Sequence, residues 1–321
     1  IIIEGTHMSI INPAILTLGS INIDLILSME RLPVAGENLF GKDYLYVPGG
    51  KGANQAVAAS LLGANVVFVG KVGDDINGKS LIRELHKKGI TTEYIYLDKT
   101  VPTGLAAIVL ESMSQNRIIV YPGANMSITE NEVIRAFERS YDALLLQLEI
   151  PEQTVISACS LAKAKNIPVI VDAGPAQDFP LEKIKGIEIL SPNETETYAM
   201  CGIKPNNYQN AVEAAKILKK RSGAKFVVIK LGDKGALLFS DSHCELIPSI
   251  PVEVIDPTAA GDAFIAALTI EYLRSGNIVK AVQYGNIVGA ISVTKLGAQP
   301  SLPTIFEVEE FIENRELMNN T

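Results

Sequence analysis

Short, almost entirely apolar runs rich in β-branched residues recur along the chain, at residues 14–18, 66–69, 143–148, 169–172, 187–190 and 226–229. Such uniformly apolar strands are typical of a parallel sheet that is buried on both faces. Stretches with helical periodicity lie between them, at residues 52–62, 76–88, 151–165 and 208–221. The alternation predicts right-handed βαβ crossovers and a three-layer α/β fold with a mostly parallel central sheet.

Two stretches depart from this alternation. Residues 39–47 and 104–121 are predicted to form strands without helices of their own, with a polar turn at residues 112–116 inside the second stretch. They predict a small additional β layer, which is either a lid over a site at the carboxyl ends of the main strands or padding at a sheet edge. The lid strands are expected from about residues 20–50 and 100–122.

The carboxyl-terminal part is mostly helical, at residues 260–274 and 277–295, and ends in a polar tail from Thr304. No repeat, low-complexity tract or linker rich in Pro, Gly or Ser divides the chain, so a single domain is expected over residues 9–321. Residues 1–8, IIIEGTHM, lack the features of a signal peptide and are interpreted as a tag remnant that ends at a native start, Met8.

The composition narrows the range of partners. Hydrophobic residues make up 47% of the 321 positions and charged residues 20%, as in a folded globular protein. Lys and Arg number 28 against 36 Asp and Glu, and the net charge of −8 argues against nucleic acid or an anionic membrane as a partner. No apolar run is long enough to span a membrane. Three widely spaced cysteines and three isolated histidines suggest neither disulfides nor a transition metal, so a cytoplasmic location and small-molecule partners are expected.

Residues 73–80, GDDINGKS, match the phosphate-binding loop pattern GxxxxGK[ST], follow a predicted strand and open a predicted helix. Asp172, at the end of an apolar run, is a candidate for the magnesium-binding carboxylate of such a site. However, Asp74 and Asp75 would repel a triphosphate from the amides of the loop. A P-loop NTPase is therefore ranked second, and the alternative is that these carboxylates cap the helix while Lys79 is solvated.

Residues 254–264, VIDPTAAGDAF, lead from a strand end through small residues into a predicted helix. Small residues at a helix start leave backbone N–H groups uncovered, and with the positive end of the helix dipole they form an anion site. Asp262 falls in the first turn, where it either only stabilises the dipole or accepts the proton of a hydroxyl group. A developing negative charge beside a proton acceptor is what phosphoryl transfer to an alcohol needs.

Two further stretches carry polar groups suited to a ligand with several hydroxyls. Residues 48–56, PGGKGANQA, form a glycine turn into an Ala-rich helix, and Lys51 and Asn54 could direct donors at hydroxyl groups. The alternative is a tight turn with a solvated lysine. In GSINID, Asn22 and Asp24 share a face if the segment is extended. Two buried polar side chains on one face need partners, and a sugar supplies them.

Eight motifs resemble, in the same order, those of the ribokinase-like (PfkB) carbohydrate kinase family, over about residues 15–303. They are GSINID (19–24), PGGKGANQA (48–56), PGAN (122–125), LQLEIP (146–151), PNETE (192–196), KLGDKGA (230–236), DPTAAGDAF (256–264) and KLGAQPS (295–301). The resemblance implies a Rossmann-like fold with a β-sheet lid that covers the sugar and often forms a homodimer interface. The GDD at residues 73–75 also resembles a family loop, which makes the P-loop match a coincidence.

The same resemblance implies ATP-dependent phosphorylation of D-ribose at its 5-hydroxyl. Asp262 would be the general base, and the amides of Ala259, Ala260 and Gly261 would form the anion hole. The residues expected to hold the sugar together with Asp262 are Asn22, Asp24, Gly50, Lys51, Asn54 and Glu149. The residues expected to hold the nucleotide are Asn193, Lys230, Gly232, Gly235, Gly261 and Asn286.

Two metal ions are also implied by the resemblance. Asn193 and Glu196 resemble an element that organises Mg²⁺ and the phosphates through water, although alone they read as a turn and a helix-start carboxylate. An activating monovalent cation, K⁺, is expected chiefly on backbone carbonyls at Asp256, Thr258, Ser292, Lys295, Gly297 and Ser301. Two residues depart from the family pattern, because Pro257 replaces the usual Thr and Asp172 stands where these kinases commonly have Asn.

Two further hypotheses remain besides ribose phosphorylation and a P-loop NTPase. The first is a kinase of the same family that acts on 2-deoxyribose or another sugar. The second is a non-catalytic sugar-binding module, against which the presence of Asp262 and of the complete AAGD run argues.

Overall fold

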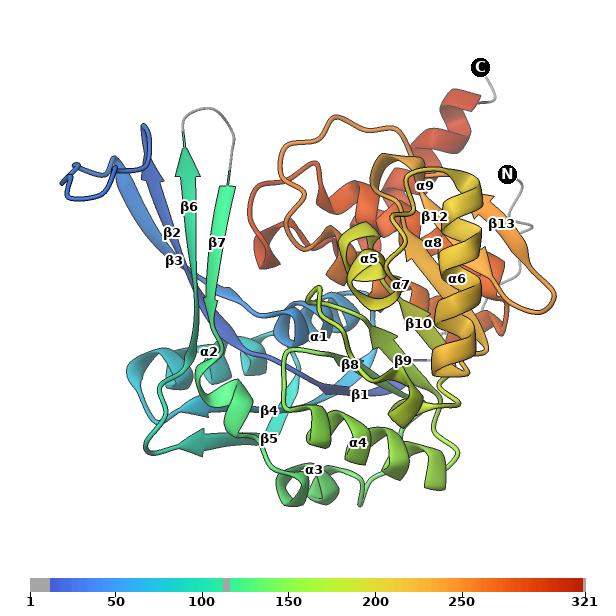
Figure 1. The fold of residues 1–321 in the computed structure, drawn as a ribbon, viewed down its shortest axis with the longest axis horizontal. Coiled ribbons are helices and arrows are strands. Elements are labelled where there is room, and N and C mark those ends of the chain that lie inside the picture. The colour runs from blue at the N-terminus through green and yellow to red at the C-terminus, as the bar shows by residue number, and fades with distance from the viewer. Residues whose placement is uncertain (1–11, 112–115, 320–321) are drawn as a thin grey trace.

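The computed structural model describes residues 12–111 and 116–319. The supposed tag at residues 1–8 lies outside the described residues, as does the turn predicted at residues 112–116 except for its last residue. Within the described ranges the structure has one large sheet with helices on both faces and a second, smaller sheet that stands away from it (Figure 1). This arrangement confirms the predicted three-layer α/β class.

The large sheet has nine strands in the order β13-β12-β11-β10-β9-β8-β1-β4-β5. Their bounds are β1 Ala14–Leu18, β4 Asn65–Gly73, β5 Thr91–Asp98, β8 Ala143–Gln147, β9 Val169–Asp172, β10 Ile189–Ser191, β11 Phe226–Lys230, β12 Ala236–Phe239 and β13 Cys244–Ile247. The strands from β5 to β11 pair in parallel, whereas β12 and β13 are antiparallel. All six predicted strands are present, and the sequence reading did not identify β5, β12 or β13.

Two hydrophobic cores lie on opposite faces of this sheet. Side chains alternate along each strand, so in β8 Leu145 joins one core while Leu144 and Leu146 join the other. The first core is covered by α1 Lys51–Leu61, α2 Ile76–Lys87, α7 Ala260–Ser275, α8 Ile278–Ser292 and α9 Ile305–Asn319. The second is covered by α3 Glu130–Ala136, α4 Glu152–Ala164, α5 Glu194–Cys201 and α6 Tyr208–Ser222. This double burial explains why the strands are apolar at almost every position.

The predicted polar tail is in fact the helix α9. Thr304 caps it, because its hydroxyl accepts from the Glu307 N–H while the Glu307 carboxylate accepts from the Thr304 N–H. The spacing T-x-x-E was therefore a helix-start signal that the sequence reading did not use. Within the described ranges, none of the helices combines the length and the apolar character needed to cross a membrane.

The smaller sheet has four strands in the order β3-β2-β6-β7. Their bounds are β2 Asn22–Met29, β3 Asp43–Gly49, β6 Gly104–Glu111 and β7 Asn116–Tyr121. They form a sheet of their own, so the alternative that they pad the edge of the large sheet is wrong. The strand predicted at residues 39–47 begins only at Asp43, because Asp43 pairs with Ser28 near the end of β2 and earlier residues have almost no strand to pair with.

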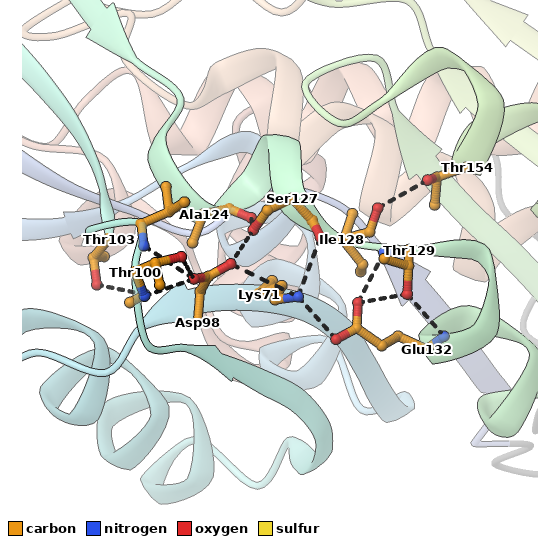
Figure 2. A network of polar contacts seen from close by, with 12 residues as sticks. Lys71, Asp98, Thr100, Thr103, Ala124, Ser127, Ile128, Thr129, Glu132 and Thr154 are labelled. Atoms are coloured by element: carbon orange, nitrogen blue, oxygen red, sulfur yellow. Dashed lines mark hydrogen bonds and ion pairs between the residues drawn. The ribbon is translucent and has the colours of Figure 1, made fainter.

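A polar network around Lys71 lies beneath the smaller sheet (Figure 2). Lys71 Nζ donates to Glu132 Oε1 at 2.9 Å and to the Ser127 carbonyl at 3.1 Å, and it lies 3.8 Å from Asp98 Oδ2. Asp98 also accepts from the Ser127 hydroxyl at 2.7 Å and from the backbone and hydroxyl of Thr100. These residues flank the points where β6 begins and β7 ends, so the network fixes the attachment of the smaller sheet.

Candidate active site

The first turn of α7 presents backbone N–H groups beside a buried carboxylate. Ala259, with φ of 62°, precedes the helix and accepts the Ala263 N–H at 2.9 Å, while the Ala260 N–H donates to the Pro257 carbonyl at 3.2 Å. A helix offers no internal acceptor to the next N–H groups, those of Gly261 and Asp262. In this structure the Ala260 amide is thus engaged within the turn, and the anion-binding role predicted for it remains a prediction.

Asp262 is held by two side-chain amides from α1. Its Oδ2 accepts from Asn54 Nδ2 and its Oδ1 from Gln55 Nε2, each at 3.0 Å. The side chain is only 6% exposed. Burial raises the pKa of Asp262 to about 6, although the nearby Lys51 and the two amides act in the opposite direction. A carboxyl with such a pKa is ionised at neutral pH and is able to take up a proton.

The glycine turn before α1 brings Lys51 into the same region. Gly50, with φ of 91°, precedes the helix, and an added Cβ would lie 2.7 Å from the Asn22 backbone nitrogen, so only glycine fits there. Burial alone would lower the pKa of Lys51, but the carboxylates of Asp262 and Asp172 outweigh it and raise the pKa above its usual value. Lys51 is half-buried beside these carboxylates rather than fully solvated.

Two acidic residues and one amide close the other side of this region. Asn22 and Asp24 are buried and lie on one face of β2, as predicted from their spacing. Burial raises the pKa of Asp24 to about 7, and the charges of Glu149 and Asp262 add to that rise. The Lys51 N–H donates to Glu149 at 3.4 Å. The structure therefore brings together the residues predicted to hold a sugar.

Asn54 carries one of several buried oxygens that lack a hydrogen-bond partner within the described residues. Its Nδ2 donates to Asp262, but its buried Oδ1 has no hydrogen-bond partner. A buried acceptor without a donor costs free energy of about 1–3 kcal/mol. A hydroxyl group bound beside Asp262 would satisfy it.

A cavity of about 830 Å³ opens next to Asp262. Its lining includes Lys51, Glu196 and the turn from Ala259 to Asp262. It also includes every residue that was predicted to bind the nucleotide, namely Asn193, Lys230, Gly232, Gly235, Gly261 and Asn286. Lys230 lies close to the turn, because a Cβ added at Gly261 would be 3.6 Å from Lys230 Nζ. The cavity therefore joins the predicted base to the predicted nucleotide residues.

Asn193 and Glu196 form a capping box at the start of α5. Asn193 Oδ1 accepts from the Glu196 N–H at 2.9 Å, and Glu196 Oε2 accepts from the Asn193 N–H at 2.7 Å. The alternative given for this pair, a turn and a helix-start carboxylate, therefore describes its local contacts. Glu196 Oε1 lies beside Gly174, because a Cβ added there would be 2.7 Å from it. One buried carboxylate oxygen at the cavity wall suits a hydrated Mg²⁺ bound through water.

The residues predicted for the monovalent cation lie on two adjoining segments. The Asp256 carboxylate accepts from the Thr258 N–H and from the Gly297 N–H, each at 2.9 Å, and so joins the two segments. The hydroxyls of Ser292 and Ser301 donate to nearby carbonyls, and Lys295 forms an ion pair with Glu307. The Lys295 side chain is a cation itself, so this residue could contribute only its backbone carbonyl, the ligand type that the resemblance implied.

The P-loop reading does not fit the geometry of residues 73–80. Asp75 Oδ1 accepts from the Gly78 N–H at 2.8 Å and its Oδ2 accepts from the Thr103 N–H at 2.8 Å. Asp74 pairs with Lys79 at 2.6 Å. A carboxylate of the chain itself therefore occupies the place where a triphosphate would bind, and the alternative of a capped helix is confirmed for Asp75.

Three buried amides near the site were not predicted from the sequence. Gln55 bridges Asp262 and Asp172, Gln147 donates to Gln55, and Asn125 donates to Asn22 Oδ1 at 2.7 Å. Gln55 carried a usable signal, because it is a polar residue inside an otherwise Ala-rich buried helix and must have partners there. Asp172, noted as a departure, also has a partner of opposite charge in Lys230.

Comparison with known proteins identifies the family. Residues 12–305 match the sequence model described as pfkB family carbohydrate kinase. The chain belongs to this carbohydrate kinase family. Among its relatives is a ribokinase of Haemophilus influenzae, 38% identical over 300 residues, which are 92% of this chain and 97% of that protein. A deoxyribokinase of Salmonella typhi is 33% identical over 305 residues, which are 94% of this chain and 99% of that protein.

A solved structure of another family member is also similar. The ribokinase of Arabidopsis thaliana, complexed with ribose and ATP, superimposes with a TM-score of 0.86 at 32% identity, covering 94% of this chain and 99% of that one. As a pfkB family carbohydrate kinase, the protein is an ATP-dependent phosphotransferase. This confirms the resemblance stated from its eight motifs.

Proposed function

We propose that the protein is a ribokinase that transfers the γ-phosphoryl group of ATP to the 5-hydroxyl of D-ribose. The observation that carries the proposal is the position of Asp262, whose carboxylate lies at the start of α7 and at the wall of the 830 Å³ cavity. The names of its relatives support the choice of ribose.

Asp262 would act as the general base. It accepts the proton of the 5-hydroxyl as that oxygen forms its bond to the γ-phosphorus and the bond to the leaving ADP breaks. The Gly261 and Asp262 N–H groups at the helix start, together with Lys51, would offset negative charge on the transferring group. The unpaired Asn54 Oδ1 would accept from a sugar hydroxyl, which would fix the sugar beside Asp262.

Magnesium and potassium belong to the proposal as cofactor and activator. Glu196 would hold hydrated Mg²⁺, which supplies charge neutralisation for the phosphates. K⁺ would bind carbonyls of the segments that Asp256 joins. Pro257 lines the cavity and its carbonyl accepts the Ala260 N–H. This departure from the family pattern therefore lies between the cavity and the segment proposed to bind K⁺.

The smaller sheet is proposed as a lid and as a homodimer interface. Strand alternation places Tyr44, Tyr46, Ile119 and Tyr121 on the face opposite to Asp24. These four side chains are between 53% and 66% exposed. An exposed apolar face of this kind is typical of a protein–protein contact. Sedimentation of the protein, beside a Tyr46→Asp variant, tests the dimer.

A 2-deoxyribose kinase is the second candidate, and the relationship to a deoxyribokinase favours it over other sugars. The two enzymes differ in whether Asn22 and Asp24 meet a 2-hydroxyl group. Release of ADP should therefore be measured with ribose, 2-deoxyribose and a panel of other sugars, with and without K⁺. We expect kcat/KM for ribose to exceed that for 2-deoxyribose by at least about tenfold, the effect of one lost hydrogen bond. Equal values would contradict the choice of ribose.

A further inference from the structure

Gln55 is a buried amide that connects two carboxylates of the candidate active site. It lies in α1 and is fully buried. Its Nε2 donates to Asp262 Oδ1 at 3.0 Å and to Asp172 Oδ2 at 2.9 Å. An amide nitrogen carries two protons, so one is available to each carboxylate. Its Oε1 accepts from Gln147 Nε2 at 2.5 Å, which keeps the nitrogen turned toward the carboxylates.

We propose that Gln55 is a positioning residue for the phosphoryl transfer. Its Nε2 donates to both Asp262 and Asp172, and this keeps the Asp262 carboxylate ionised and oriented to accept the proton of the sugar hydroxyl. This inference rests on the proposed function. It assigns Gln147 a supporting role, since Gln147 determines which end of the Gln55 amide faces the carboxylates.

The charges around Asp262 explain why such a donor is needed. Burial and the neighbouring Asp172 both favour the protonated form of Asp262, whereas Lys51, Gln55 and Asn54 favour the ionised form. The other ionisable groups facing this region are Asp24 of β2, Glu149 after β8, Glu196 of α5 and Lys230 of β11. Lys230 forms an ion pair with Asp172. Gln55 therefore links the proposed base to a buried ion pair at the cavity wall.

The alternative is that Gln55 only fills space in α1. The two roles make different demands on the pH dependence of the reaction. A space-filling residue affects folding or activity equally at every pH. A residue that stabilises the ionised form of Asp262 determines the pH below which activity is lost. The second role predicts a shift of the acidic limb of the kcat/KM profile when the two donated hydrogen bonds are removed.

Gln55→Met tests this, because methionine keeps the length of the side chain and removes both donors. We expect the acidic limb of kcat/KM for ribose to move up by about one pH unit, the effect of one hydrogen bond to an ionised acceptor. Activity near pH 9 should approach that of the parent. The phosphates of ATP titrate identically for every variant, so a difference between two pH profiles reports a change in the titration of the protein.

Asp172→Asn provides a matched variant with the opposite sign. It removes the charge that disfavours ionised Asp262, so the acidic limb should move to lower pH. Gln147→Met keeps the two Gln55 donors but removes the hydrogen bond that orients them. It should shift the acidic limb in the same direction as Gln55→Met, by a smaller amount.

An unmoved limb in folded Gln55→Met, or a loss of activity that is equal at all pH values, overturns the inference. If Gln55→Met does not fold, an unmoved limb in Gln147→Met overturns it. These outcomes are distinct from failure of the proposed function. Parent-like activity of Asp262→Asn, or absence of sugar-dependent ADP release in the unchanged protein, would overturn the proposed function itself.

Discussion

Two clusters of charged residues, one half-buried around Lys71 and one buried around Asp262, are built from the same residue types and behave differently. In the Lys71 cluster, defined here as Lys71, Asp98 and Glu132, hydrogen bonds from Ser127, Thr100 and Val101 hold the pKa of Asp98 well below its usual range. Around Asp262, burial outweighs the available donors, and the pKa values of Asp262 and Asp24 rise to about 6 and about 7.

The difference separates a structural cluster from a functional one. Both carboxylate oxygens of Asp98 accept from donors of the protein, as do those of Asp262, but at Asp98 the hydrogen bonds outweigh burial and at Asp262 they do not. The cluster around Asp262 leaves Asn54 Oδ1 without a donor and its carboxylates incompletely compensated. Groups with raised pKa values beside a cavity are typical of sites that act on a ligand.

Asp262→Asn should have the largest effect on activity. The amide keeps the shape of the side chain but takes up no proton from a hydroxyl, so kcat should fall by about 10²–10⁴-fold while KM changes little. The measurement is ADP release at saturating ribose and ATP. Asp98→Asn is the control, with kcat near that of the parent for the folded protein. A comparable loss in both variants would contradict the separation of the two clusters.

Lys71→Met should have the largest effect on stability. The Lys71 side chain is 12% exposed, and its loss leaves Asp98 and Glu132 without their cation. We expect the free energy of unfolding in urea to fall by about 1–3 kcal/mol, the cost of losing hydrogen bonds to charged groups, with kcat of the folded protein unchanged. The matched control is Lys183→Met, whose ion pair with Glu152 is half exposed and should contribute less than about 1 kcal/mol. Equal losses would show that the Lys71 cluster is not structurally special.

Lys79→Ala should have the smallest effect. Lys79 is 51% exposed and pairs with Asp74 of its own loop. We expect kcat to stay within about twofold and the free energy of unfolding to change by less than about 1 kcal/mol. Complete loss of activity would favour the P-loop hypothesis and would contradict the assignment of the reaction to Asp262.

The central strands were predictable because burial on both faces leaves runs that are apolar at almost every position, and the helices between them were predictable from their helical periodicity. Val169–Asp172 and Phe226–Lys230, for example, are apolar at nearly every position. The strand β5, Thr91–Asp98, mixes polar and apolar residues at an edge of the sheet, and the antiparallel β12 and β13 lie at the other edge. Exposed positions in the edge strands β5 and β13 interrupt the apolar pattern. The four residues of β12 are apolar and buried on both faces, so they carried the signal and were missed.

The motifs predicted the residues of the candidate site but not the contacts among them. Asn54 was expected to meet a sugar, and the structure adds that it also donates to Asp262. The bridge from Gln55 to Asp172 joins residues 117 positions apart, and only the fold brings these together. The engagement of the Ala260 N–H by Pro257 likewise depends on turn geometry that composition does not determine.

The stabilities of Asp262→Asn and Asp98→Asn in urea at pH 8 test the central claim most directly. The folded-state pKa of Asp262 lies above the ordinary 3.8, so its ionisation costs stability as the pH rises through about 6. The pKa of Asp98 lies below its ordinary value, so its ionised form stabilises the fold above that value and the benefit is lost in acid. The account predicts that Asp98→Asn lowers the free energy of unfolding, whereas Asp262→Asn leaves it unchanged or raises it by up to about 3 kcal/mol. A loss of stability in Asp262→Asn as large as that in Asp98→Asn would contradict it.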